Sequence, residues 1–265
     1  MRYFDHKNNR LVITGSRATS DFWDNLWQDQ NLEKTIRNNR DWLVAPLTKK
    51  YIPPQKSKKI LEGGCRKGQY VYSLDKSGYD AYGIDSAEKT IEKVKNIFPQ
   101  LKISVGDVEK LEFPDEYFDG YWSLGVIEHF YEGYEKTAAE MQRVIKQGGF
   151  LFIAFPQVSL LRRLKSGLGG YEKFDKNIFN QDAFYEFALD EKEVREYFEN
   201  NGFTLRKRIH LDGLKGLKDE ILFLKPTLQK FYDNKNKFVT LLRAVISRIL
   251  APISGHSILL IFTKK

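Results

Sequence analysis

The sequence is poor in cysteine and in long apolar runs. Cys65 is the one cysteine among 265 residues, so an intrachain disulfide framework is excluded and a reducing compartment is expected. No cysteine–histidine cluster has the spacing of a zinc site, and we predict no bound metal. No uncharged apolar run reaches the roughly 18 residues of a transmembrane helix, and the polar segment 1–10 lacks the apolar core of a signal peptide. These features predict a cytoplasmic protein.

Apolar side chains are abundant and positive charge is unevenly distributed. Hydrophobic residues make up 42% of the chain and aromatic residues 14%, which is typical of a folded globular protein. The length allows one elaborated domain or two small ones. From Gly202 onward there are 13 Lys and Arg against 4 Asp and Glu, whereas the net charge of the whole chain is +8. The C-terminal quarter is therefore suited to anionic lipid, nucleic acid or an acidic substrate, or it is a solvated basic face.

A glycine-rich turn follows a short apolar segment. Residues 59–61 run into Glu62, and three glycines follow within six residues, at Gly63, Gly64 and Gly68. This pattern predicts a strand that turns sharply into a helix, because glycine adopts positive φ and allows backbone to approach a ligand. The N–H groups at the start of the helix would face that ligand. An acid at the strand end disfavours a pyrophosphate and favours a ligand that carries an ammonium group.

Strands and helices alternate from residue 59 onward, which predicts an α/β fold with a doubly wound, mostly parallel sheet. Such a sheet binds ligands at the carboxyl ends of its strands. Asp85 lies 23 residues after Glu62, where a carboxylate accepts hydrogen bonds from ribose hydroxyls; capping of the next helix is the alternative. The predicted strands are 59–62, 80–84, 102–105, 118–123, 150–155, 203–210 and 256–265, and the predicted helices are 69–77, 87–98, 134–145 and 190–201.

The segment EGGCRKG resembles the first motif of the class I S-adenosylmethionine (SAM) methyltransferases, which reads acid-x-Gly-x-Gly-x-Gly. Arg66 stands where the middle glycine is usual, and a positive φ there would strain an arginine. A nicotinamide-binding GxGxxG loop fits less well, because Cys65 would replace its central glycine. DGYWSLGVIEHF and QRVIKQGGFLFIAFP resemble later motifs of the same family, in the same order. The chain is most similar to its small-molecule members, which include quinone and lipid methyltransferases.

The resemblance implies a Rossmann-like sheet of seven strands, with the last strand antiparallel, and SAM as cofactor with S-adenosylhomocysteine (SAH) as product. Asp107 would face the adenine amino group, Val108 would pack on the ring, and the backbone after Ser123 would face the methionine portion. The cofactor-binding residues implied by the resemblance are Glu62, Gly63, Gly64, Cys65, Gly68, Asp85, Ser86, Asp107, Val108 and Ser123.

The pair Glu128-His129 is the candidate for acceptor chemistry. An imidazole with a pKa near 6.5 is a natural base for a hydroxyl that attacks a methyl group, and Glu-His at this place is common in the resembled family. His129 is therefore a candidate base or substrate ligand, with packing near the cofactor as the alternative. Glu128 is expected to be structural. A base is not obligatory, because alignment of the nucleophile in a dry site accelerates the reaction by itself.

We predict an N-terminal helical cap over 1–57 and a SAM-binding domain over 58–265. Residues 1–19 are expected to be irregular, and Ser20 or Asp21 is expected to cap a helix that continues toward residue 47. Trp23 and Trp27 share a helix face, so they either pack in the core or cover the ligand pocket. Insertions at about 157–189 and 211–255 lie between strands that meet at the ligand edge. We therefore expect them to form a lid, which excludes water and selects substrate.

The lid segments are apolar, aromatic and basic, which favours an acceptor with apolar bulk, an anionic group, or both. LLRRLK and the 238–253 helix either lie peripherally in a membrane interface or pack as a buried lid. Nucleic acid is disfavoured as a partner, because the basic segment is too apolar to track phosphates. The predicted function is methyl transfer from SAM to oxygen or nitrogen of a small-molecule or lipid-like acceptor. The alternatives are a non-catalytic SAM-fold binding or scaffold protein, and a methyltransferase that acts on protein or RNA.

Overall fold

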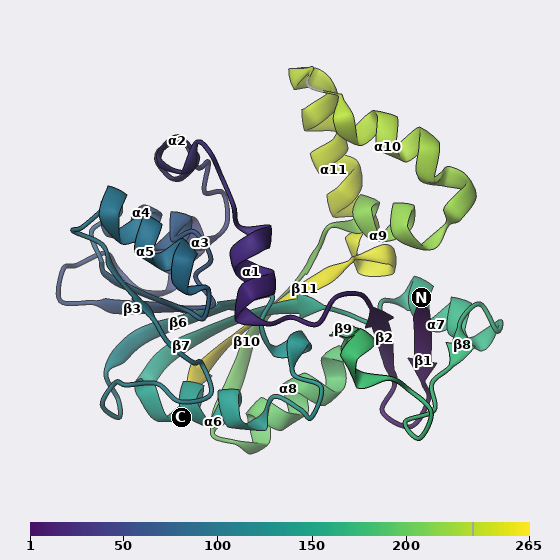
Figure 1. Ribbon diagram of the computed structural model, residues 1–265, viewed down its shortest axis with the longest axis horizontal. Coiled ribbons are helices and arrows are strands. Elements are labelled where there is room, and N and C mark those ends of the chain that lie inside the picture. Colours follow the sequence, from purple (N-terminus) through teal and green to yellow (C-terminus); the bar gives the residue numbers. More distant parts are fainter. Residues whose placement is uncertain (235) are drawn as a thin grey trace.

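A computed structural model describes residues 1–234 and 236–265, and its centre is a twisted seven-stranded sheet with helices on both faces (Figure 1). The strand order is β10-β11-β7-β6-β3-β4-β5. The strands are β3 (Lys59–Gly63), β4 (Asp80–Asp85), β5 (Lys102–Val105), β6 (Phe118–Leu124), β7 (Ile145–Pro156), β10 (Phe203–Leu211) and β11 (Ser257–Lys264).

The pairing of these strands confirms the predicted fold class. β3 pairs in parallel with β4 and β6, β4 with β5, and β6 with β7. β11 is antiparallel to both of its neighbours, β7 and β10. The carboxyl ends of the five parallel strands therefore meet at one edge of the sheet. The helices that cover its two faces are α4 (Gln69–Lys76), α5 (Glu88–Ile97), α6 (Glu135–Val144) and α8 (Glu191–Asn200).

Alternation along the central strands divides the core between the two faces of the sheet, since successive side chains of a strand point to opposite faces. Tyr121 belongs to the apolar cluster on one face, and its neighbour Trp122 belongs to the cluster on the other. Trp122 stacks on Phe152, with ring centroids 4.3 Å apart. Its indole N–H donates to the hydroxyl of Thr48 at 2.9 Å, so the buried polar atom is satisfied.

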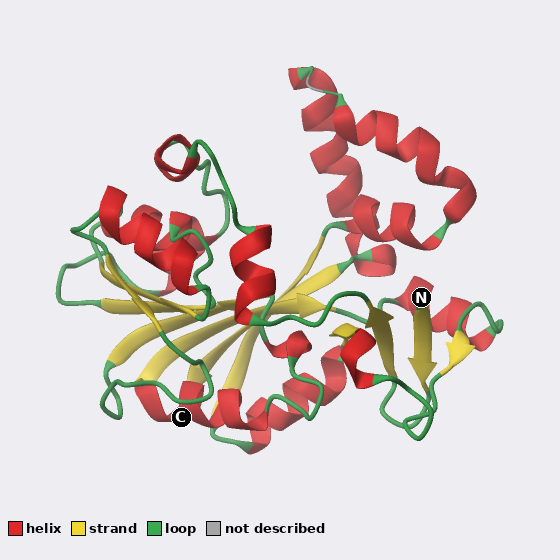
Figure 2. Cartoon of the chain, viewed as in Figure 1, coloured by secondary structure: helices red, strands yellow, loops and turns green. Residues whose placement is uncertain are grey.

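A second sheet of four strands has the order β8-β1-β2-β9 and is built from distant parts of the chain, as the labels and colours of Figure 1 show. In Figure 2 its strands form a group apart from the large sheet. The expectation that residues 1–19 are irregular is wrong, because β1 and β2 form an antiparallel hairpin there. Leu11 and Val12 of the hairpin are fully buried. The hairpin is stabilised by pairing with β9, a partner remote in sequence. The strands are β1 (Arg2–Asp5), β2 (Arg10–Thr14), β8 (Glu172–Lys173) and β9 (Phe184–Ala188).

The segment after the hairpin forms three short helices, α1 (Ser20–Leu26), α2 (Leu32–Arg37) and α3 (Val44–Tyr51), and not one continuous helix. The N-cap of α1 is Thr19, whose hydroxyl accepts the Phe22 N–H at 3.2 Å; the expected caps, Ser20 and Asp21, already lie inside the helix. Aspartates in the connections bond to backbone instead of continuing a helix. Asp41 alone accepts the N–H groups of three successive residues, 43–45.

The two insertions differ in where they go. The first returns to the second sheet through α7 (Leu160–Gly167), β8, η2 (Gln181–Ala183) and β9. The second is helical, and its α10 and α11 extend away from the large sheet (Figure 1). Its elements are α9 (Gly213–Glu220), η3 (Leu222–Leu224), α10 (Lys225–Asp233) and α11 (Lys237–Ser254). The division into a cap over 1–57 and a domain over 58–265 stays a prediction.

Candidate active site

A cavity of about 840 Å³ runs along the carboxyl ends of the five parallel strands. Gly64 follows β3, Asp85 ends β4, Gly106 follows β5, Leu124 ends β6 and Pro156 ends β7, and all five line the cavity. This edge is where open parallel sheets bind their ligands. The fold therefore brings the ends of five separate segments to one concave site.

The turn after β3 requires glycine at two positions. Gly64 has φ +76° and Gly68 has φ +71°, a left-handed conformation that L-residues avoid. A Cβ on Gly64 would also lie 2.5 Å from the Val126 side chain, and one on Gly68 would lie 2.4 Å from Ile103. Cys65, between them, is fully buried, and burial raises the pKa of its thiol. It is a packing residue of the turn and not a reactive thiol.

Asp85 is held in place by the turn it faces. Its Oδ2 accepts the backbone N–H of Arg66 at 2.7 Å, and its Oδ1 accepts the N–H of Ala87 at 2.9 Å. The side chain is buried at the cavity wall, and burial raises the pKa of the carboxyl. Two backbone bonds fix the carboxylate while each oxygen keeps a further lone pair for a ligand.

Glu62 lies one residue before the turn and is fully buried. Among the described residues, neither of its carboxyl oxygens has a hydrogen-bond partner. Burial raises the pKa of this carboxyl to about 8, so the acid is mostly protonated at pH 7. A buried polar group without a partner is costly, and an ammonium-bearing ligand would relieve that cost.

Arg66 is the departure from the resembled motif, and its side chain is part of the cavity wall. Its φ is +56°, so the position does require the left-handed conformation that glycine would adopt freely. The guanidinium donates to the backbone carbonyl of Leu124. It also lies 5.8 Å from the ring centroid of Trp27. Arg66 therefore adds a positive charge beside the glycine turn and does not point into solvent.

The predicted site residues divide into a lining group and a supporting group. The lining group surrounds the cavity, whereas the supporting group is buried behind it or in the turn. Lining residues are Gly64, Asp85, Ser86, Asp107, Val108 and His129, and supporting residues are Glu62, Gly63, Cys65, Gly68 and Ser123.

His129 lies at the other half of the cavity, in a fixed orientation. Its Nδ1 is 2.9 Å from the backbone carbonyl of Tyr185. Because a carbonyl only accepts, Nδ1 carries the proton and Nε2 keeps its lone pair. The ring meets Trp23 edge-on, with centroids 5.0 Å apart. Burial lowers the pKa of His129 to about 4, so the imidazole is neutral at pH 7.

Two carboxyl groups join His129, and one of them was not predicted from the sequence. Ligand atoms of Glu128, His129 and Glu186 all lie within 4.8 Å of one another. Glu128 is buried, and its Oε2 has no partner among the described residues. Burial raises the pKa of both carboxyls, and the charge of Glu186 raises that of Glu128 further. The three side chains form an acidic, hydrogen-bond-accepting cluster with the ligand types that a cation uses.

Glu186 was missed because it comes from β9, whose neighbours in sequence carry no chemical motif. An acid between aromatic residues in the segment FYEFA was the available signal.

The indoles of α1 cover the cavity. Trp23 and Trp27 are stacked, with centroids 5.6 Å apart and planes inclined by 8°. Both line the cavity, as do Tyr185 and Phe184 of β9. The alternative that these tryptophans cover the pocket is therefore the one observed. The second insertion contributes Leu211 and Asp212, while its described helical residues, 213–234 and 236–254, do not contribute to the lining.

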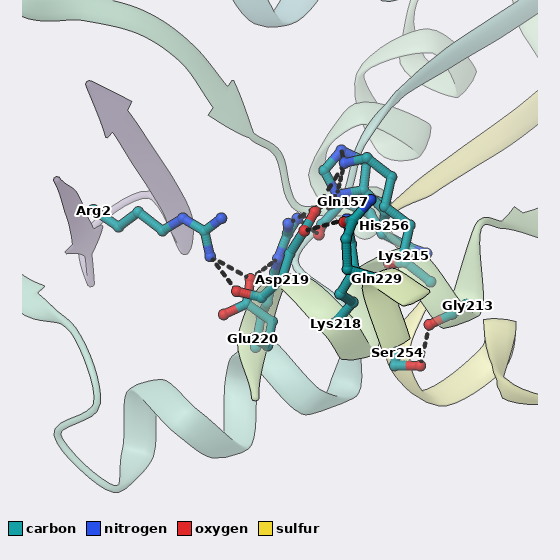
Figure 3. A network of polar contacts seen from close by, with 12 residues as sticks. Arg2, Gln157, Gly213, Lys215, Lys218, Asp219, Glu220, Gln229, Ser254 and His256 are labelled. Carbon is teal, nitrogen blue, oxygen red and sulfur yellow. Dashed lines mark hydrogen bonds and ion pairs between the residues drawn. The ribbon is translucent and has the colours of Figure 1, made fainter. Parts of the chain in front are cut away.

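A buried network of ion pairs and hydrogen bonds reaches His256, which lines the cavity (Figure 3). Arg162 and Glu220 pair at 2.8 Å, with both side chains 1% exposed. Arg2 of β1 and the Tyr171 hydroxyl bind the same carboxylate, at 3.0 Å and 2.6 Å. Burial first, and then nearby cations, lower the pKa of the cavity-lining His256 to about 2. Arg162 of the LLRRLK segment is therefore an internal residue and does not face a membrane.

Known proteins are similar in sequence to the central part of this chain. Residues 61–153 match the family profile described as a methyltransferase domain. The ubiquinone biosynthesis O-methyltransferase of Coxiella burnetii is 29% identical over 119 residues, which cover 42% of this chain and 50% of the relative. The 2-methyl-6-phytyl-1,4-hydroquinone methyltransferase of Synechocystis is 31% identical over 107 residues, covering 39% of this chain and 33% of the relative. The chain thus spans half or less of the length of these relatives.

Solved structures have a similar fold. The TehB-like SAM-dependent methyltransferase from Corynebacterium glutamicum has a TM-score of 0.54 and 18% identity, over 93% of this chain and 98% of that chain. At this identity the likeness concerns the fold alone. Within the described residues, no helix combines the length and hydropathy that crossing a bilayer requires.

Proposed function

We propose that this chain, whose residues 61–153 match a methyltransferase domain profile, is a class I SAM-dependent methyltransferase that transfers a methyl group to oxygen or nitrogen of a small-molecule or lipid-like acceptor. One observation carries the proposal. A single cavity joins Asp85 and the glycine turn to the cluster of Glu128, His129 and Glu186. A donor site and an acceptor site that share one cavity are what direct group transfer requires.

The residues around the turn fit the cofactor. The partnerless carboxyl of Glu62, buried behind the cavity wall, would attract its ammonium group, and the guanidinium of Arg66, on the wall, would pair with its carboxylate. Asp85 would accept from the ribose hydroxyls, with both oxygens already oriented by backbone. Asp107 and Val108 line the wall where an adenine would lie. When bound, SAM supplies an electrophilic methyl group on a sulfonium.

His129 and its two acidic neighbours would orient the acceptor. The lone pair of Nε2 is free to accept a hydrogen bond from an acceptor O–H or N–H, since Nδ1–H is engaged by the Tyr185 carbonyl. The proton of the acceptor nucleophile would pass to Nε2 of His129 or to an ionised carboxylate of the cluster, while the methyl–sulfur bond of a bound SAM breaks and SAH is the leaving group. The aromatic walls exclude water and hold the nucleophile in line, which supplies acceleration without a strong base.

The cavity lining favours a neutral or amine-bearing aromatic acceptor over an anionic one at the His129 end. The two carboxyl groups there offer an anion no cationic partner, whereas Trp23 and Tyr185 offer flat apolar faces. The relatives named above are methyltransferases of ubiquinone biosynthesis and of a hydroquinone, which supports an apolar acceptor with a ring hydroxyl. An anionic substituent would have to lie near Arg17 or Lys136, which also line the cavity.

The test is acceptor-dependent formation of SAH from SAM. Hydroquinones, catechols and aromatic amines with apolar tails should give SAH above the level found without acceptor, and mass spectrometry should show one added methyl group. If the protein binds SAM but forms no methylated product with any acceptor class, the non-catalytic binding module is favoured. If it binds neither SAM nor SAH, the proposed cofactor site is wrong.

A further inference from the structure

The second insertion carries an unusual concentration of exposed apolar side chains. Among the described residues, 17 large hydrophobic side chains are exposed, and eight of them lie on η3 and α11. Phe238, Leu241 and Ile249 are 72%, 64% and 69% exposed. Scattered exposed hydrophobic residues are normal, but a contiguous group marks an interaction surface.

Six of these side chains share one face of α11. At 100° per residue they span about 120° of the helix circumference, the width of a complete apolar stripe. The stripe consists of Phe238, Leu241, Leu242, Val245, Ile249 and Ile253.

The opposite face of α11 is the one attached to the protein, and it is made of small residues. A Cβ on Gly213 of α9 would lie 2.3 Å from the Ala251 nitrogen, and a Cβ on Gly216 would lie 1.6 Å from the Ser254 carbonyl oxygen. The Ser254 hydroxyl donates to the Gly213 carbonyl at 2.7 Å. The helix is thus anchored backbone to backbone through its small face. Its large apolar face is left outward, the reverse of an ordinary surface helix.

The positive charge of the second insertion indicates which partner binds the outward face of α11. Between residues 221 and 254 the sequence has six Lys and Arg and one acid, Asp233. Lys237 and Arg248, both exposed, flank one edge of the stripe. A second copy of the chain would bring the same positive charges together across a two-fold interface. An anionic bilayer complements both the charge and the apolar stripe.

We propose that the outward stripe of α11 docks in the interface of an anionic lipid bilayer. The helix is too polar to cross a membrane, and as an 18-residue helix of about 27 Å it would lie along the surface. Both ends of its insertion reach the cavity rim, at Asp212 and His256, so docking would bring the cavity close to lipid-dissolved acceptors. The docking itself is independent of methyl transfer.

The test is co-sedimentation of the full chain with vesicles of phosphatidylcholine containing phosphatidylglycerol, against vesicles of phosphatidylcholine alone. The wild type should bind the anionic vesicles, and salt should weaken binding. Phe238→Ser/Leu241→Ser/Ile249→Ser should lower the partition coefficient more than tenfold, and Lys237→Glu/Arg248→Glu should remove the preference for anionic lipid. Ile178→Ser, which replaces an 85% exposed isoleucine elsewhere, should bind like the wild type.

Circular dichroism and SAH titration of each variant separate docking from folding and from the cofactor site. Absence of wild-type binding to anionic vesicles, or equal binding by the triple variant, would overturn the proposal. A wild-type dimer in sedimentation analysis that becomes monomeric in the triple variant, without vesicle binding, would assign the stripe to a second copy instead. Failure of the wild type to bind SAH would contradict the proposed function but not the docking of the stripe on lipid.

Discussion

At the residue scale, Asp85 shows how the fold prepares a side chain for a ligand. The last residue of β4 points at the glycine turn, and its carboxylate is oriented by two backbone N–H groups. The chain thus fixes this acceptor before any ligand arrives, which reduces the ordering cost of binding.

Replacement of Asp85 by alanine should therefore lower the affinity for SAH more than tenfold, since buried acceptor atoms at the ribose position are lost. Asp80→Ala is the matched control: Asp80 begins the same strand and pairs with exposed Lys102 at 2.6 Å. Calorimetry should give near-wild-type affinity for the control. Equal affinities of the two variants would remove Asp85 from the cofactor site.

His129 differs chemically from the sequence expectation because burial lowers its pKa from 6.5 to about 4. The imidazole should therefore stay neutral down to about pH 4. Turnover that depends on neutral His129 should decline, as the pH is lowered, with an apparent pKa near 4 and not near 6.5. His129→Asn keeps a donor for the Tyr185 carbonyl and removes Nε2. It should slow turnover at least tenfold and leave SAH affinity unchanged; an unaltered rate would exclude His129 from the chemistry.

The lowered pKa of His129 also determines how this residue makes the stability of the protein depend on pH. Between pH 6.5 and 4 the unfolded chain protonates this histidine while the folded chain does not. Stability from this group therefore falls as the pH drops through 6.5. Urea unfolding of His129→Asn should show a weaker loss over that range than the wild type.

At the element scale, the contact of α9 with α11 depends on the absence of side chains. Gly216→Ala would place a methyl group 1.6 Å from a backbone oxygen, so the helices must separate. We expect a loss of about 1–3 kcal/mol and faster proteolysis within α11. Gly167→Ala, where a Cβ meets no atom within 4 Å, should change stability by less than about 0.5 kcal/mol. Identical behaviour of the two variants would contradict the close packing.

The sequence predicted the large sheet better than the small one, because the two sheets differ in how far apart in sequence their paired strands lie. β3 to β7 and their helices carry local signals: apolar strands, glycine turns and helical periodicity. β1 and β2 form a short local hairpin, but the sheet that holds it is completed by β8 and β9, which are remote in sequence, so residues 1–19 were wrongly expected to be irregular. Glu186 was not predicted as a site residue for the same reason, since its proximity to His129 arises from that remote pairing. The strain at Arg66 was foreseen, but its direction toward Leu124 was not.

At the scale of the whole molecule, one buried carboxylate joins three separate parts of the chain. Glu220 of the second insertion binds Arg162 and Tyr171 of the first insertion and Arg2 of β1. Although burial raises the pKa of Glu220, these partners lower it, and the net shift is downward. The carboxylate is therefore ionised at pH 7 and holds the insertions against the small sheet.

Neutralisation of this group should destabilise the protein because Arg162 would remain buried without a counter-charge. We expect Glu220→Gln to cost about 3–5 kcal/mol in urea unfolding. Glu33→Gln removes an exposed helical ion pair with Arg37 and should cost less than about 1 kcal/mol. A similar small cost for both would mean that the network does not hold the insertions together.

The most direct test of the cofactor site is calorimetric titration of SAH at pH 7 in two buffers that differ in ionisation enthalpy. The wild type should bind with one-to-one stoichiometry and release a proton, because an ammonium group would lower the raised pKa of Glu62, which is about 8 in the free protein. Glu62→Gln should bind more weakly and release less. Failure of the wild type to bind SAH, or the same proton release from both proteins, would contradict the assignment of this cavity to SAM.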